Sequence, residues 1–135
     1  MRLWHKDLIP YLPRQQLLGQ WRECCAIAKN IAEKGTPNHV LVNRIMDYDR
    51  RDFDKYTYRV WEEMARRGFR PDWNKYGKIR NVNAIWIKWN DKIFKGWHND
   101  RYLRQCLTNL QEKSDCGAIP EKEWERITSI WPEWR

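Results

Sequence analysis

The sequence has little of what usually assigns an enzyme to a class. Only 4 cysteines occur among 135 residues, in no Cys-x-x-Cys spacing, and only 3 histidines, widely spaced along the chain. Glycine-rich phosphate loops, His-Glu-x-x-His pairs and Gly-x-Ser-x-Gly turns are absent. The sequence therefore carries none of the common hydrolase signatures, and it predicts neither a metal site nor a bound cofactor.

Long hydrophobic runs are also missing. The short apolar pair Leu8 and Ile9 is interrupted by Pro10, so no secretory signal is recognisable, and no segment approaches the length that spans a membrane. Adjacent helical cysteines at positions 24 and 25 cannot easily share one metal ion, so we expect buried or partly buried reduced thiols. The sequence therefore predicts a cytoplasmic protein without membrane contact.

Positive charge is plentiful and unevenly distributed. Lysine and arginine number 26 against 18 acids, which gives a formal net charge of +8 and a pI near 9.5. Residues 66–95 carry nine bases and two acids, whereas residues 96–135 carry six bases and seven acids. This pattern favours a polyanionic partner, and nucleic acid over a membrane because no basic amphipathic helix stands out. Ordinary solubilising charge is the alternative.

Aromatic residues are unusually frequent, with 10 tryptophans and 14% aromatic content. Many must lie in the core, but Trp131 and Trp134 are candidates for stacking or docking groups in a polar tail. Residues 72–97 alternate basic and aromatic side chains without clean periodicity. We expect this stretch to be irregular or partly helical, with a strand over 84–88 as an alternative. It is either a loop packed by its tryptophans or a nucleic-acid surface.

Helical periodicity and end signals predict an all-α fold. Helices are expected over 14–34, before Gly35 and Pro37, and over 51–67, before Gly68 and Pro71. A third is expected from residue 99 or 100 to 113, and a short fourth after Pro120.

The remaining segments are expected to be irregular. Residues 1–13 hold two prolines but enough apolar side chains to be pinned on the domain, and residues 36–49 include a short apolar turn. We expect one compact domain over 1–135, with three main helices, a short C-terminal helix and long irregular connections.

One acid is out of place within the first helix. At about 100° per residue, Leu17 and Trp21 belong to a broad apolar stripe, whereas Glu23 points almost directly away from it. Its neighbours one turn away, Gly19 and Ala26, are small, so the surface around the carboxylate is expected to be open. A solvated surface glutamate is the alternative. The α-amino group is a nucleophile that needs no motif, and an amine can attack a sugar C1′ to give a Schiff base.

Two motifs carry a family resemblance. The run Leu17-Leu18-Gly19-Gln20-Trp21-Arg22-Glu23, followed by Ala65-Arg66-Arg67-Gly68-Phe69, resembles the pyrimidine-dimer DNA glycosylases of the phage endonuclease V family. The pair at 39–40 and the helix over 98–113 are similar to that family more weakly. The resemblance implies a small all-α protein that flips or kinks damaged DNA, attacks C1′ with its N-terminal amine and cleaves the strand by β-elimination.

The resemblance also implies roles for individual residues. Glu23 would stabilise the developing cation and manage protons on the opened sugar, and Met1 would supply the amine, because the bulk of Arg2 should block methionine removal. The implied DNA contacts are Arg2, Arg22, Arg66, Arg67 and Lys113. A histidine and an arginine of the family are replaced here by Gln16 and Ala26, which leaves the lesion specificity open.

The expected partner is double-stranded damaged DNA, bound by a monomer in the cytoplasm at the nucleoid. A non-catalytic nucleic-acid-binding domain that keeps the basic face is the first alternative. An interaction module that docks through its tryptophans is the second.

Overall fold

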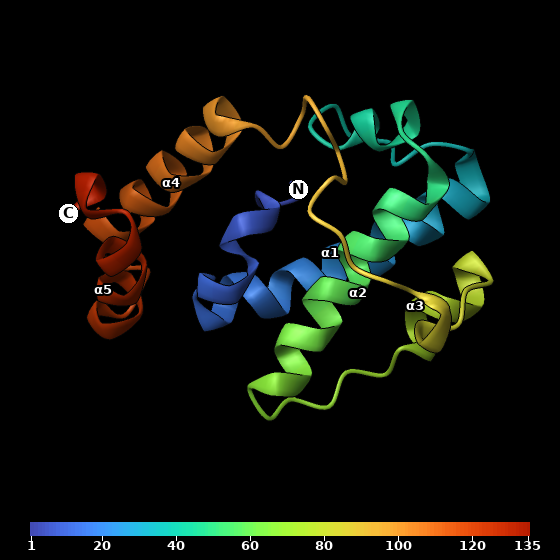
Figure 1. Ribbon diagram of the computed structural model, residues 1–135, viewed down its shortest axis with the longest axis horizontal. Helices are drawn as coiled ribbons and strands as arrows, with labels where there is room; N and C mark the ends of the chain where they lie inside the picture. The colour runs from blue at the N-terminus through green and yellow to red at the C-terminus, as the bar shows by residue number, and fades with distance from the viewer.

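The computed structural model describes every residue from 1 to 135, and its regular elements are all helical (Figure 1). The α-helices are α1 (Arg14–Lys34), α2 (Arg50–Arg66), α3 (Asn74–Arg80), α4 (Asp100–Asp115) and α5 (Glu121–Ile130). The 3-10 helices are η1 (Lys6–Tyr11), η2 (Asn43–Asp47), η3 (Ala84–Trp86) and η4 (Pro132–Trp134). The predicted all-α class is confirmed.

Helices α1 and α2 cross at the centre of the molecule, and their ends follow the signals in the sequence (Figure 1). Helix α1 ends at Gly35, whose φ of 75° is left-handed and whose N–H donates to the carbonyl of Ile31. After α2 the N–H of Phe69 folds back onto the carbonyl of Met64 at 3.0 Å, next to Gly68 with φ 92°. The predicted boundaries of both helices are correct to within one residue.

Helices α4 and α5 form the arm that lies opposite α3 in Figure 1. The side chain of Asn99 caps α4 by accepting from the N–H of Tyr102. Trp134 at the chain end is buried, and its Nε1 donates to Thr108 Oγ1 at 3.3 Å. Trp134 is therefore a packing group of α4, and not the free stacking group that the sequence suggested, while Trp131 packs edge-on against Tyr11.

The stretch over 72–97 is more ordered than the sequence indicates. Its first part forms α3, which packs on α1 and brings the rings of Trp21 and Trp73 to 6.2 Å between centroids. The alternative of a strand over 84–88 is wrong, because this part of the chain makes the 3-10 turn η3. Ile93, Phe94 and Trp97 then return to the core.

A single cluster of 26 buried apolar residues makes the core. Leu3, Leu8, Ile9 and Leu12 belong to it, so the predicted pinning of the N-terminal segment is confirmed. None of the helices is both long and apolar enough to traverse a bilayer.

Candidate active site at the N-terminus

The N-terminal segment is held on α1 by one buried glutamine. Gln20 Oε1 accepts from the N–H of Trp4 at 2.7 Å, and its Nε2 donates to the carbonyl of Arg2 at 3.0 Å. The hydroxyl of Tyr56 on α2 donates to the carbonyl of Trp4 at 2.6 Å and lies 3.0 Å from Gln20 Oε1. Since buried polar groups must find partners, this set of bonds fixes the path of residues 2–4.

Glu23 lies one turn along from Gln20 and faces the same segment. Its Oε2 accepts from the backbone N–H of Arg2 at 3.4 Å and from Gln20 Nε2 at 3.4 Å. The carboxylate is half-buried, so the expected open surface around it is wrong: the N-terminal segment covers part of it. Both bonds are long and go to one oxygen, which leaves Oε1 for a substrate or water.

The amine of Met1 lies within about 7 Å of the Glu23 carboxylate. Met1 is 39% exposed and immediately precedes Arg2. Successive backbone nitrogens are at most about 3.6 Å apart, and the Arg2 nitrogen itself contacts Glu23. The structure therefore brings the chain's amino group and the carboxylate of Glu23 to one small region of the surface.

Helix α4 holds the N-terminal segment from the other side, so the N-terminus lies between α1 and α4 (Figure 1). The hydroxyl of Tyr102 donates to the carbonyl of Leu3. The guanidinium of Arg2 lies 4.0 Å from Cys106 Sγ and stacks over the ring of Trp4. Free movement of the first residues is thus restricted by side chains on three helices.

Two buried histidines stack beneath this segment. The rings of His5 and His98 are 5.2 Å apart, and the Nδ1 of His98 accepts from the N–H of Lys6 at 3.0 Å. Burial lowers the pKa of His98 well below its usual value and lowers that of His5 as well. Both imidazoles are therefore neutral at pH 7, and their hydrogen bonds anchor the segment.

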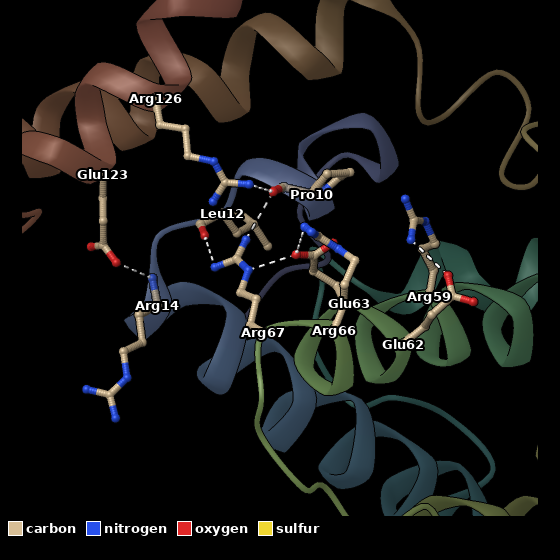
Figure 2. A network of polar contacts seen from close by, with 10 residues as sticks. All are labelled: Pro10, Leu12, Arg14, Arg59, Glu62, Glu63, Arg66, Arg67, Glu123 and Arg126. Carbon is tan, nitrogen blue, oxygen red and sulfur yellow. Dashed lines mark hydrogen bonds and ion pairs between the residues drawn. The ribbon is translucent and has the colours of Figure 1, made fainter.

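A second anchor joins the end of α2 to η1, and Figure 2 shows it from close by. Buried Glu63 accepts from Arg67 Nε at 2.8 Å and from Arg66 Nη2 at 2.5 Å. Arg67 also donates to the carbonyls of Leu12 at 2.8 Å and Pro10 at 3.1 Å. The guanidinium of Arg67 is thus engaged within the protein, whereas the side chain of Arg66 is 58% exposed.

The other predicted contacts are distributed over the molecule. Arg22 is exposed beside Glu23, and Arg2 is half-buried at the same place. Arg66 lies at the end of α2 and half-buried Lys113 near the end of α4. The structure thus brings together Met1, Arg2 and Glu23, has Arg22 next to Glu23 in the chain, and leaves the remaining predicted contacts outside this site.

A polar groove follows the outward face of α4 and was not predicted. Three neighbouring hollows of about 650, 420 and 140 Å³ share the side chain of Gln105, and the smallest reaches Arg2. Arg44, Arg101 and Arg104 supply the positive charge. We call these hollows the α4 groove. The signal was present, because polar residues 101, 104, 105, 108 and 112 recur at helical spacing opposite the apolar stripe.

The cysteines are all free, as expected. Burial raises the pKa of Cys24 and raises that of Cys25 to about 11, so both thiols are inert at neutral pH. Cys116 is exposed, which corrects the expectation of buried or partly buried thiols at that position.

The fold and the site define a basic, all-helical protein in which a groove with several arginines reaches Arg2, whose backbone N–H contacts the carboxylate of Glu23. A family model for pyrimidine dimer DNA glycosylases matches residues 1–76, which is more than half of the chain. The chain therefore belongs to the pyrimidine dimer DNA glycosylase family. No curated protein and no solved structure matches it. The matched residues include Met1, Arg2, Arg22 and Glu23, whereas α4 and the groove residues that it carries lie beyond them.

Proposed function

We propose that this DNA glycosylase excises pyrimidine dimers from duplex DNA and then cleaves the strand as an abasic-site lyase. Met1 supplies the attacking amine and Glu23 the catalytic carboxylate. The proposal rests on the contact of the Arg2 N–H with Glu23 Oε2 at 3.4 Å. That contact supports an amine held next to a negative charge, as a Schiff-base mechanism requires.

In the proposed reaction the Met1 nitrogen forms a bond to C1′ while the glycosidic C–N bond breaks. The bonding electrons leave with the base, which takes up a proton. The nitrogen then loses one proton, the C1′–O4′ bond breaks with uptake of a proton by O4′, and an iminium ion that keeps the second N–H forms. Glu23 stabilises this cation electrostatically. Removal of a proton from C2′ breaks the C3′–O bond, and water finally hydrolyses the imine to free the amine.

The proposed DNA path follows the α4 groove toward the amino terminus. One strand contacts Arg44, Arg101 and Arg104 through its phosphates and reaches Arg2 and the exposed Arg22 at the lesion. Exposed Arg66 and half-buried Lys113 serve as outer contacts. The DNA contact of Arg67 stays a prediction. Three nitrogens of its guanidinium already donate to Glu63, Leu12 and Pro10 within the protein. The protein acts as a monomer in this proposal.

Substitution of Glu23 tests the proposal. We expect Glu23→Gln to lower dimer excision and strand cleavage about 100-fold or more, measured on a duplex with one cyclobutane pyrimidine dimer. The amide keeps the size of the side chain but removes its charge, so binding of the duplex should persist. The control is Glu33→Gln, an exposed acid on the same helix, which should retain full activity. Equal cleavage by the Glu23→Gln variant and the wild type would reject the assignment.

Binding without catalysis is the second candidate, and the α4 groove favours it because the groove does not include Glu23. A binding domain of this kind would hold duplex DNA with a strong dependence on salt. Its affinity would be unaffected by acetylation of the N-terminus, and neither base release nor cleavage would follow.

A further inference from the structure

The turn η3 presents apolar side chains to solvent beyond the region that the family model covers. Ile85 and Trp86 are each 78% exposed, whereas the other nine tryptophans of the chain are buried or half-buried. An aromatic side chain exposed to this degree adds little to the stability of the fold. A ring in such a position is typical of binding surfaces.

Hydrogen bonds hold the turn in place. The side chain of Asn83 accepts from the N–H of Ile85 at 3.2 Å, and the N–H of Trp86 donates to the carbonyl of Asn83 at 3.1 Å. At the base of the turn, Trp73 Nε1 donates to the carbonyl of Val82 at 3.0 Å. The exposed ring of Trp86 is therefore carried by a fixed backbone.

A hollow of about 460 Å³ lies between this turn and α3, within the size range of small-ligand sites. Trp86 lines it together with three amide side chains, those of Asn74, Asn81 and Asn83, and with Lys78. Gly77 also lines it, and a Cβ there would lie 2.5 Å from Trp73 Nε1 and 2.7 Å from the Val82 carbonyl. Only glycine permits the close packing that shapes this wall.

Bases outnumber acids around the hollow, where the nearest acid is Asp72, which accepts from the N–H of Asn74 at 2.9 Å. Residues 73–90 contain four bases and no acid. Of these, Arg80 is buried and paired with Asp54 at 2.9 Å, while Lys75, Lys78 and Lys88 are exposed. The exposed ring and the amide-lined hollow thus lie in a positive field that complements a polyanion.

We propose that η3 and the adjoining end of α3 form a second site, which binds an unpaired nucleotide of single-stranded DNA. A base stacks on the indole of Trp86, the amides of Asn74, Asn81 and Asn83 hydrogen-bond its edge, and Lys78 contacts a phosphate. Stacking of this kind tolerates any base because every base has a π-face. The site requires neither Met1 nor Glu23, so it is independent of the function proposed above.

The test is fluorescence anisotropy with a short labelled oligothymidylate. We expect Trp86→Ala to weaken binding about tenfold, consistent with the loss of one stacked base, and Trp86→Phe to restore most of the affinity. Ile130→Ala is the matched control, because Ile130 is 48% exposed on α5, and it should bind as the wild type does. Circular dichroism checks that helix content is unchanged in each variant.

The salt dependence of binding distinguishes the phosphate contact of Lys78 from base stacking on Trp86. Lys78→Gln should reduce the slope of log affinity against log salt by about 0.7, the value for one phosphate on a single strand, whereas Trp86→Ala should leave that slope unchanged. Oligothymidylate binding by Trp86→Ala at wild-type affinity would overturn the proposal. So would a wild-type protein that binds no oligothymidylate, which would indicate a protein partner for the exposed turn.

Glu23→Gln separates this site from the proposed active site. The variant should bind oligothymidylate as tightly as the wild type does. Loss of cleavage with retained binding would leave both proposals standing. Retained cleavage would reject the active site alone, and unchanged oligothymidylate binding by Trp86→Ala would reject the second site alone.

Discussion

Residues 1–12 and residues 81–92 both lie outside the α-helices, yet the first segment buries its apolar side chains and the second exposes some of them. The N-terminal segment buries Leu3, Leu8 and Ile9 completely and gives its backbone groups to Gln20, Tyr56 and Arg67. Residues 81–92 bond mainly to one another and expose Ile85 and Trp86. In our proposals the first arrangement fixes the position of the attacking amine, and the second offers a surface for binding.

The two regions are expected to contribute differently to the free energy of folding. Each buried hydrogen bond that anchors the N-terminal segment contributes about 1 kcal/mol to folding. The position of the Met1 amine depends on these hydrogen bonds. An exposed apolar turn contributes little to folding, so its substitution should alter binding and not stability. Three predictions test this difference, in order of decreasing effect on stability.

The largest effect is expected at the anchor between α2 and η1. Arg67→Ala should destabilise the fold by about 3 kcal/mol, since it removes the less exposed of the two guanidinium partners of buried Glu63 and the donor to the carbonyl of Leu12. Arg66→Ala is the matched control and should cost less than about 1 kcal/mol, because that side chain is 58% exposed. Urea unfolding measures both, and equal losses would contradict the anchoring role.

A smaller effect on the stability of the fold is expected when the pH is lowered. The pKa values of His5 and His98 are lowered by burial, so below the unfolded pKa of about 6.5 the unfolded chain binds protons that the folded chain does not. Stability should therefore fall as the pH drops below about 6.5. Nearby Lys6 and Arg44 act in the same direction on His98, whereas Asp7 opposes the shift at His5.

Urea midpoints between about pH 7.5 and about pH 5.5 measure this dependence, a window that spans the ordinary histidine pKa and avoids most carboxylates. His98→Gln should be less stable at the upper pH and should show a flatter profile. His39→Gln is the control and should keep the wild-type slope. A wild-type slope in the His98→Gln variant would show that this histidine does not carry the effect.

The smallest effect on stability is expected at the exposed turn. Trp86→Ala should change the free energy of unfolding by less than about 0.5 kcal/mol, although it removes a large aromatic ring. Trp4→Ala is the matched comparison, since Trp4 is 6% exposed in the core, and it should cost about 3 kcal/mol or more. A large loss from Trp86→Ala in thermal unfolding would show that the turn supports the fold.

Local signals in the sequence predicted most of the helices. Gly35, Gly68 and Asn99 mark helix ends by their own backbone or side-chain chemistry, so the boundaries of α1, α2 and α4 follow from few residues. Helix α3 was not predicted from its pattern, because a seven-residue helix with Gly77 and three basic residues shows no apolar stripe.

The candidate site was predicted only in part, because a local sequence pattern does not contain contacts between distant residues. The outward direction of Glu23 follows from helix geometry, but its cover by Arg2 is a contact between residues 21 positions apart that no local pattern contains. The face of α4 that lines the groove resembles an ordinary solvated helix face in the sequence, and its extension to Arg44 and Arg2 depends on contacts with segments distant in sequence. Tertiary contacts therefore decide which polar face becomes part of a groove.

Borohydride trapping on an abasic-site duplex, followed by peptide mass spectrometry, tests the central claim most directly. Untagged wild-type protein should give a covalent adduct on the nitrogen of Met1, and neither the Glu23→Gln variant nor N-terminally acetylated protein should accumulate it at a comparable rate. An adduct on a lysine side chain, or no adduct with protein that still binds the duplex, would contradict the account.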